Sequence, residues 1–167
     1  MVDTEKIRKM YLPNRVRLLL VGESPPASGK FFYCGDSSMK TYTARAFAHA
    51  YGLPPFGDSD EFFAFFKEHG CYLDDISVIP IDKMSNSDRK AQLKACEADL
   101  SRRMRQLNPE VVVAVLRRIE PFVRRAVALA GITPVLEVLC FPGQGHQKKF
   151  VTELSRIVQR VLLADSR

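Results

Sequence analysis

The sequence lacks three features that would assign a class of protein at once. No apolar run approaches the roughly 20 residues that a membrane-spanning helix needs. The four cysteines form no Cys-x-x-Cys pair, and no set of His, Cys, Asp and Glu has the spacing of a zinc site. The first residues, 1–11, are polar and charged, unlike a secretory signal. We therefore expect a cytoplasmic protein with free thiols, no metal and no membrane span.

Positive charge is what the chain has in excess. Lys and Arg number 25 against 19 Asp and Glu, which gives a formal net charge of +6. Such a balance favours polyanionic partners, because Lys and Arg release counterions from a phosphate backbone. The hydrophobic fraction of 46% and the charged fraction of 26% are those of an ordinary globular protein. A chain of 167 residues is long enough for one domain with a core.

The order of apolar patterns indicates an α/β protein. Runs rich in β-branched residues predict buried strands at residues 16–21, 76–80, 110–116 and 134–140. Helical spacing occurs between and after them, at residues 87–107 with Ser87 as the N-cap, 119–126 and 150–161. Alternating strands and helices imply a parallel sheet covered on both faces. We find no repeat or linker, and expect residues 1–167 to form one three-layer α/β/α domain with a four-stranded, mostly parallel sheet.

Two loops are the candidates for function, because ligands of such sheets bind beyond the carboxyl ends of the strands. The first, residues 22–37, combines Glu23 with three adjacent aromatic residues, 31–33. The second, residues 141–149, follows the last strand. Two interpretations of the first loop remain open. Either Glu23 orients a water and the aromatic rings stack on a nucleobase, or Glu23 pairs with an arginine and the rings pack under the loop.

A phosphate-binding P-loop does not fit the first loop. That motif has four residues between its glycines and a hydroxyl after its lysine. Here six residues separate Gly22 from Gly29, and Phe31 follows Lys30. Pro25 and Pro26 also remove two amide donors.

Several stretches are similar to motifs of a known family. The sequence reads GESPP and then GKFFYCG after the first strand, CYLDDISVIP around the second, and ACEADLSRRMRQLNPEVVVAVL leading into the third. In this order they resemble the uracil-DNA glycosylase superfamily, especially its iron–sulphur branch. Members of that family have Gly-Glu-Ala-Pro-Gly, Gly-Arg-Pro-Phe-Val-Gly, Tyr-Ile-Thr-Asn and a helix that ends in Asn-Pro. The resemblance extends from about Arg15 to the end of the chain.

The resemblance implies roles residue by residue. Glu23 is expected to orient the attacking water, and Phe32 or Tyr33 to stack on the extruded base. Asp75 falls where the family has the asparagine that reads the pyrimidine edge. The implied function is a DNA glycosylase-like repair enzyme, without metal or other cofactor. It would hydrolyse the N-glycosidic bond of a flipped-out uracil or other deaminated base, with DNA as its partner.

Asp75 is a departure from the family that affects base recognition. An asparagine amide can accept from N3–H and donate to O4 of uracil, whereas an ionised aspartate only accepts. Three solutions remain open. Asp75 is protonated, or Asp74 or Ser77 acts in its place, or the base is not uracil.

The last motif departs as well. The family has His-Pro-Ser after the last strand, with the histidine stabilising the departing base. Here the segment reads CFPGQGHQKKF, so Phe141 stands in the position of the histidine and Pro142 matches the proline. We expect His146, on a loop that contains two glycines, to reach the same place, or Gln144 to donate a hydrogen bond instead.

Further residues are assigned around this site. Cys96 alone matches a ligand of the iron–sulphur cluster, and its partners are absent, so no cluster is expected. Contacts to DNA phosphates are expected from Ser85, Asn86, Ser87, Lys148 and Lys149. The arginine pairs are expected to lie on solvated helix faces away from the strand ends, at 102–103, 117–118 and 124–125.

Two other functions compete with the glycosylase. One is a non-catalytic protein of the same fold that binds nucleic acid or a nucleobase, which the changes at Asp75 and in the last motif favour. The other is a hydrolase of free nucleosides or nucleotides.

Overall fold

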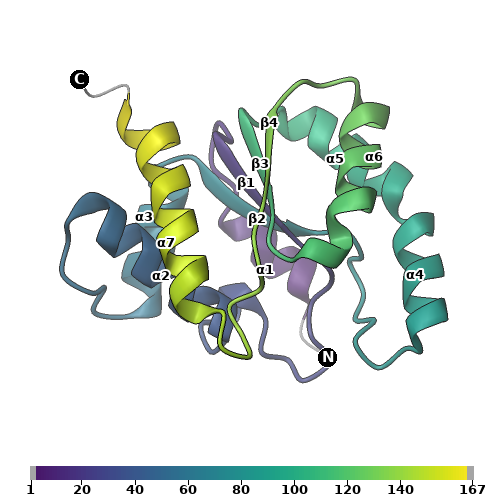
Figure 1. Cartoon of the computed structure of the whole chain (residues 1–167), viewed down its shortest axis with the longest axis horizontal. Coiled ribbons are helices and arrows are strands. Elements are labelled where there is room, and N and C mark those ends of the chain that lie inside the picture. Colours follow the sequence, from purple (N-terminus) through teal and green to yellow (C-terminus); the bar gives the residue numbers. More distant parts are fainter. Residues whose placement is uncertain (1–2, 165–167) are drawn as a thin grey trace.

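The computed structural model describes residues 3–164. At its centre lies a four-stranded sheet of order β2-β1-β3-β4, in which all three pairings are parallel. Its strands are β1 (Leu18–Gly22), β2 (Cys71–Asp75), β3 (Val111–Ala114) and β4 (Val135–Val138). Helices cover both faces (Figure 1), and the predicted three-layer α/β/α architecture is confirmed.

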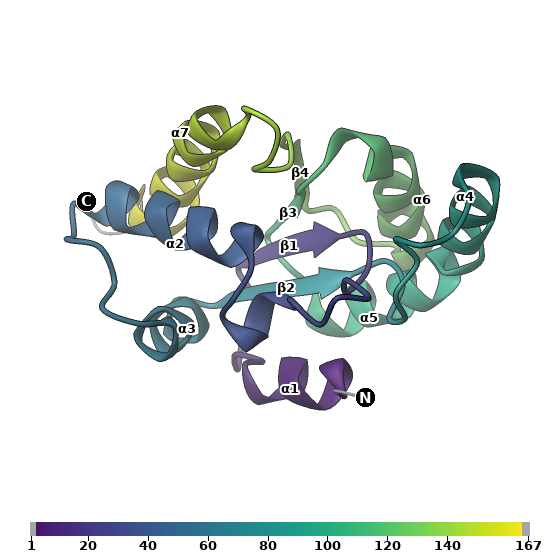
Figure 2. The same ribbon diagram turned by 90° about the horizontal axis from the view of Figure 1, so that it is seen from below.

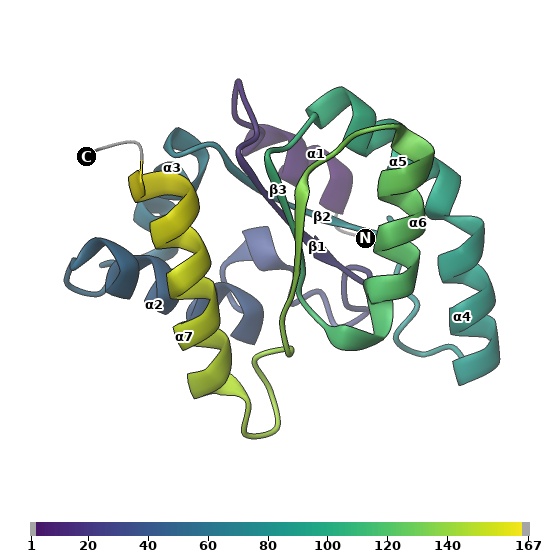
Figure 3. The same ribbon diagram turned by 45° about the horizontal axis from the view of Figure 1, so that its top comes forward.

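The helices form two groups on opposite sides of the sheet. One side carries α2 (Ser38–Tyr51), which packs on α7 (Gln147–Val158), and the other carries α5 (Glu97–Leu107), which packs on α6 (Glu120–Ala130). Figures 1 and 3 show the two pairs separated by the strands. The remaining α-helices are α1 (Thr4–Met10), α3 (Ser59–Glu68) and α4 (Asn86–Ala95). In Figure 2, α1 lies along the edge of the sheet that β2 forms.

Aromatic side chains fill the core between α2, α3 and the sheet. Phe62, Phe63 and Phe66 project from one side of α3 and are buried, as their helical spacing predicts. Phe47 of α2 meets Phe62 and Phe66 edge-on, with ring centroids 6.0 and 5.4 Å apart. Each such ring buries a large apolar area, so this cluster fixes how α3 lies against β2.

The second strand lies five residues earlier than predicted. Residues 71–75 form β2, whereas the expected strand at residues 76–80 is an irregular loop. The prediction was wrong because β2 ends in two buried carboxylates, Asp74 and Asp75, and the apolar pattern favoured the run that follows them. The correction moves both carboxylates from a connecting segment to the carboxyl end of a strand. The fourth strand also differs, since β4 is only partly buried at the edge of the sheet.

The predicted helix at residues 87–107 is two helices that meet at Cys96. Ser85 and not Ser87 caps α4, because the Ser85 hydroxyl accepts a hydrogen bond from the Asp88 N–H at 3.2 Å. Asn108 ends α5 in the left-handed conformation, with φ 42°. The four cysteines are free thiols, and Cys34 is exposed. No helix within residues 3–164 is long and apolar enough to cross a bilayer.

Gly70, which precedes β2, gives a test of this strand placement. Gly70 and Gly52 both have positive φ, 72° and 62°. A Cβ at Gly70 would lie 2.9 Å from the Arg15 carbonyl oxygen, whereas a Cβ at Gly52 would meet nothing within 4 Å. We expect Gly52→Ala to lower the free energy of unfolding by about 1–2 kcal/mol through backbone strain. Gly70→Ala should lower it by about 1–3 kcal/mol more through the clash.

Equilibrium unfolding in urea measures both losses. Equal losses for the two variants would contradict the close packing of Gly70 against the chain that enters β1.

Candidate functional site

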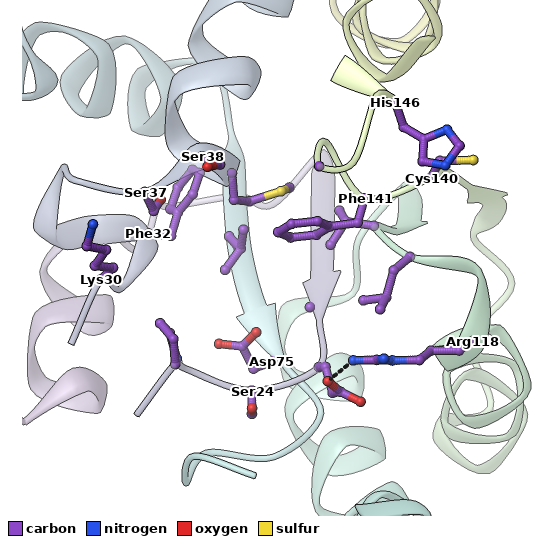
Figure 4. Close-up of a pocket in the computed structure, with 18 of the residues that line it drawn as sticks. Ser24, Lys30, Phe32, Ser37, Ser38, Asp75, Arg118, Cys140, Phe141 and His146 are labelled. Carbon is purple, nitrogen blue, oxygen red and sulfur yellow. Dashed lines mark hydrogen bonds and ion pairs between the residues drawn. The ribbon is translucent and has the colours of Figure 1, made fainter. Parts of the chain in front are cut away.

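A pocket of about 690 Å³ opens at the carboxyl ends of the strands. Its lining includes the last residue of β1, Gly22, and the last residue of β2, Asp75. Residues 115–118 after β3 also line it, as do five residues after β4: Cys140, Phe141, Gly143, Gln144 and His146. Both loops that the sequence singled out therefore contribute to one cavity (Figure 4).

Glu23 stands directly after β1, and its two carboxylate oxygens have different surroundings. Its side chain is 10% exposed, and its Oε2 accepts a hydrogen bond of 2.6 Å from Arg118 Nη2. Its Oε1 is buried and receives no hydrogen bond from the described residues. Glu23 pairs with an arginine, as the second interpretation expects, and it also lines the pocket, while its role in orienting a water stays a prediction. A buried oxygen without a donor is unfavourable, so we expect a water or a ligand to donate to Oε1.

Asp75 belongs to a buried cluster of four charges that joins three elements. Arg8 of α1 is 1% exposed and reaches Asp75 Oδ2 at 2.9 Å and Asp74 Oδ1 at 3.2 Å. Arg103 of α5 binds Asp74 Oδ2 at 2.8 Å and the Asp75 carbonyl oxygen at 2.6 Å. Two guanidinium groups thus face two buried carboxylates, and each also pairs with a further carboxylate, Arg8 with Glu5 and Arg103 with Asp99. Burial raises the pKa of Asp75, and the positive charge of Arg8 opposes this rise.

The cluster decides which side chain at the end of β2 faces the pocket. Asp74 is held by both arginines and does not line the cavity. The Ser77 hydroxyl is buried and donates to the Ile79 carbonyl oxygen at 2.8 Å. Asp75 lines the cavity, so neither Asp74 nor Ser77 replaces it there.

Tyr33 is not available to stack on a ligand, and this prediction is wrong. Its ring lies 5.0 Å from that of Tyr11 at an interplanar angle of 5°, inside the core. Its hydroxyl accepts from the Leu73 N–H at 2.7 Å, and burial raises its pKa well above the usual value. A 3₁₀ turn, Phe32–Cys34, directs the Tyr33 side chain inward. The alternative, that the aromatic residues pack under the loop, holds for Tyr33.

Two other aromatic residues of this loop do line the pocket. Phe31 and Phe32 are 2% and 4% exposed and contribute to its wall. Phe32 also packs on the phenylalanines of α3, with ring centroids 5.6 Å from Phe63 and 5.7 Å from Phe66. Its role in stacking stays a prediction.

Phe141 is the aromatic side chain that the sequence analysis missed. It is 45% exposed and lines the pocket, and Figure 4 shows its ring in the cavity. The sequence analysis treated it only as a residue that had replaced a histidine. One signal in the sequence could have identified Phe141 as a pocket residue. It is an apolar ring in the loop beyond the last strand, and Pro142 follows it.

His146 and Gln144 both line the pocket, as predicted, from the loop before α7. His146 is the N-cap residue of α7 and is exposed. Figure 4 shows it at the other end of the cavity from Asp75. Gln144 has φ 50° and an exposed side chain. Neither makes a hydrogen bond to Glu23 or Asp75 among the interactions of residues 3–164.

The expectation that the arginine pairs lie away from the strand ends is wrong for two of the three pairs. Arg117 and Arg118 lie in a 3₁₀ turn, Arg117–Ile119, soon after β3, and both line the pocket. Arg117 Nε donates to Cys140 Sγ at 3.3 Å. Arg103 is part of the buried cluster. The turn follows β3 closely, so the two arginines lie at the strand ends. The sequence pattern did not show how close to the end of β3 this turn begins.

The residues predicted to contact phosphate lie outside the cavity. Ser85, Asn86 and Ser87 are exposed at the start of α4, where Ser85 serves as the cap. Lys148 and Lys149 are exposed in the first turn of α7, next to the pocket residue His146. Lys30, which the prediction omitted, is exposed and lines the pocket itself.

Within residues 3–164, no group of three or more His, Cys, Asp and Glu side chains is placed to hold a metal ion. Comparison with models of known protein families gives no match, and no curated protein matches the sequence. The chemistry of the pocket therefore has to be argued from its own residues.

Neighbouring arginines on α5 provide a test of the buried cluster. Arg103 and Arg102 both pair with Asp99, but only Arg103 reaches Asp74, and Arg102 is 70% exposed. We expect Arg103→Met to lower the free energy of unfolding by about 3 kcal/mol, because it leaves buried carboxylate charge with less compensation. Arg102→Met should change it by less than about 1 kcal/mol.

Urea unfolding of both variants at neutral pH makes the comparison. A loss at position 103 no larger than that at position 102 would show that the cluster does not stabilise the end of β2.

Proposed function

We propose that this protein is a DNA glycosylase-like enzyme that hydrolyses the N-glycosidic bond of a base extruded from DNA. The observation that carries the proposal is the environment of Glu23. Its Oε2 is fixed by Arg118, its buried Oε1 has no hydrogen-bond donor among the described residues, and the residue lines the cavity. A carboxylate held in this way has one oxygen available to accept from a water.

The reaction needs this group because of how charge develops. Cleavage places positive charge on the sugar and negative charge on the departing base. Glu23 would accept the hydrogen bond of the attacking water and stabilise the sugar cation. The water oxygen then bonds to C1′, the C1′–N bond breaks with its electron pair going to the base, and Glu23 takes the proton of the water. Arg118 orients the carboxylate so that Oε1 remains free.

The rest of the pocket suits a flat ring. Phe31, Phe32 and Phe141 supply apolar aromatic surface, and Asp75 supplies a polar group at the end of β2. Nucleobase-modifying enzymes hold a flipped base between apolar or aromatic faces and read its pairing edge by hydrogen bonds. His146 and Gln144 are the candidates to donate a hydrogen bond to the departing base. By the resemblance, that base is uracil or another deaminated base.

The charge around the opening supports DNA as the polymer. Lys30, Arg117 and Arg118 line the cavity, and Lys148 and Lys149 follow it along α7. Cations at such positions bind phosphates without regard to sequence. The net charge of +6 is in keeping with this.

A non-catalytic protein that binds nucleic acid or a nucleobase is the second candidate. The specific observation that favours it is Phe141, which lies in the pocket where the related family has a histidine for the departing base. Oligonucleotide binding that weakens with salt, without release of any base, would select this function.

Glu23 is the residue on which the enzymatic proposal is tested. Oligonucleotides containing uracil, hypoxanthine, xanthine or an alkylated guanine are incubated with the protein, and alkali then cuts abasic sites. We expect Glu23→Gln, which cannot accept a proton in the same way, to slow base release by at least about a hundredfold.

Glu137→Gln is the matched control, because Glu137 also pairs with an arginine, Arg160, but lies outside the pocket. It should act as the parent does. A Glu23→Gln variant as active as the parent would exclude the catalytic role assigned to Glu23. If the parent released no base from any substrate, the proposed enzymatic activity would be excluded.

The two lysines of α7 test the DNA interface. We expect the double variant Lys148→Ala, Lys149→Ala to bind oligonucleotides more weakly by a similar factor for all sequences. The slope of log affinity against log salt should fall by about one for each lysine that contacts a phosphate.

Fluorescence anisotropy over a range of salt concentrations measures this slope. Lys6→Ala, Lys9→Ala on α1 is the control with the same charge change, and both of its positions are exposed. Equal effects of the two double variants would place the interface elsewhere.

A further inference from the structure

Asp75 presents one carboxylate oxygen to the pocket. Its Oδ2 is bound by Arg8, whereas none of the described residues donates a hydrogen bond to its Oδ1. Oδ1 lies against Gly22, where an added Cβ would be only 2.3 Å away. The absence of a side chain at Gly22 therefore leaves room for Oδ1 at the floor of the cavity.

Arg8 favours the ionised form of Asp75, whereas burial and the charges of Asp74 and Glu5 raise the pKa of Asp75 and oppose that form. Arg8 is buried with Asp74 and Asp75, and its guanidinium donates directly to Asp75 at 2.9 Å. A protonated Asp75 would leave that buried cation with one fewer compensating charge, which is unfavourable. An ionised carboxylate has no proton to donate, so Asp75 only accepts hydrogen bonds.

Bases differ in how their pairing edge suits such an acceptor. Uracil offers N3–H between two carbonyl oxygens, and both oxygens would be repelled by a carboxylate. Guanine offers N1–H and a 2-amino group side by side, so that two N–H donors point the same way. Hypoxanthine keeps N1–H but lacks the amino group.

We propose that the pocket selects a base with the guanine-type edge, in which N1–H and an adjacent amino group both donate to Oδ1 of Asp75, in preference to uracil. This inference rests on the proposed function for the identity of the site as a base pocket. It replaces the deaminated base of the resemblance by guanine, or by a guanine lesion that keeps this edge. Asp75 is the specificity-determining residue, and Arg8 positions it.

The experiment removes the donors of the ligand one at a time and leaves the protein unchanged. Calorimetry measures the binding of 2′-deoxyguanosine, 2′-deoxyinosine, 1-methyl-2′-deoxyguanosine and 2′-deoxyuridine to the wild-type protein. We expect deoxyguanosine to bind best and each lost donor to weaken binding by about tenfold, because hydrogen bonds to a charged group are the strong ones. Deoxyuridine should bind least.

Asp75→Asn replaces a carboxylate that only accepts hydrogen bonds by an amide that both accepts and donates them. Its amide can accept from N3–H and donate to O4, so we expect binding of deoxyuridine to improve and that of deoxyguanosine to fall. Asp36→Asn is the control, because Asp36 is exposed near the same loop and does not line the pocket. Circular dichroism shows whether the variant is folded; if it is not, the nucleoside series on the wild-type protein decides.

The outcomes separate this inference from the function on which it rests. Preferential binding of deoxyguanosine, without base release from any oligonucleotide, supports the inferred base selectivity and contradicts the proposed enzymatic activity. Base release from uracil-containing DNA, with deoxyuridine bound better than deoxyguanosine, supports the proposed enzymatic activity and overturns the inferred base selectivity. Equal binding of all four nucleosides, or no binding of any, also overturns the inference.

Discussion

The interaction on which the site depends is the buried contact of Arg8 and Arg103 with Asp74 and Asp75. Two adjacent carboxylates at the end of a buried strand would repel each other and resist burial. The two guanidinium groups compensate them and, at the same time, attach α1 and α5 to the end of β2. One set of ionic contacts thus holds a helix at the edge of the sheet, a helix on its face and the floor of the pocket.

The strand register then brings the two acidic residues of the pocket near each other. Gly22 of β1 is paired with Asp75 of β2, and Glu23 follows Gly22 directly. Glu23 and Asp75 have different surroundings in spite of this closeness. Glu23 pairs with the largely exposed Arg118, while Asp75 pairs with the buried Arg8. The two carboxylates of the pocket are therefore held by arginines that differ in burial.

The sequence predicted the layers, the parallel sheet and the two loops of the site, because these follow from apolar periodicity and from strand–helix alternation. It placed β2 too late, since periodicity has no means to recognise a strand that buries two compensated charges. It left Tyr33 beside Phe32 as a candidate stacking ring and overlooked Phe141, because a run of aromatic residues does not show which ring a 3₁₀ turn sends inward. The partners of Glu23 and Asp75 lie 95 and 67 residues away in the chain, and no local pattern can supply such contacts.

That separation along the chain has a consequence for how the protein folds. Arg8 and its acceptor Asp75 are 67 residues apart, so the contact at the pocket floor closes a long loop. Closing such a loop costs chain entropy before the contact stabilises anything. We expect the chain to collapse first around its phenylalanine cluster. The contacts of Arg8 at the floor of the pocket should form later, when α1 docks.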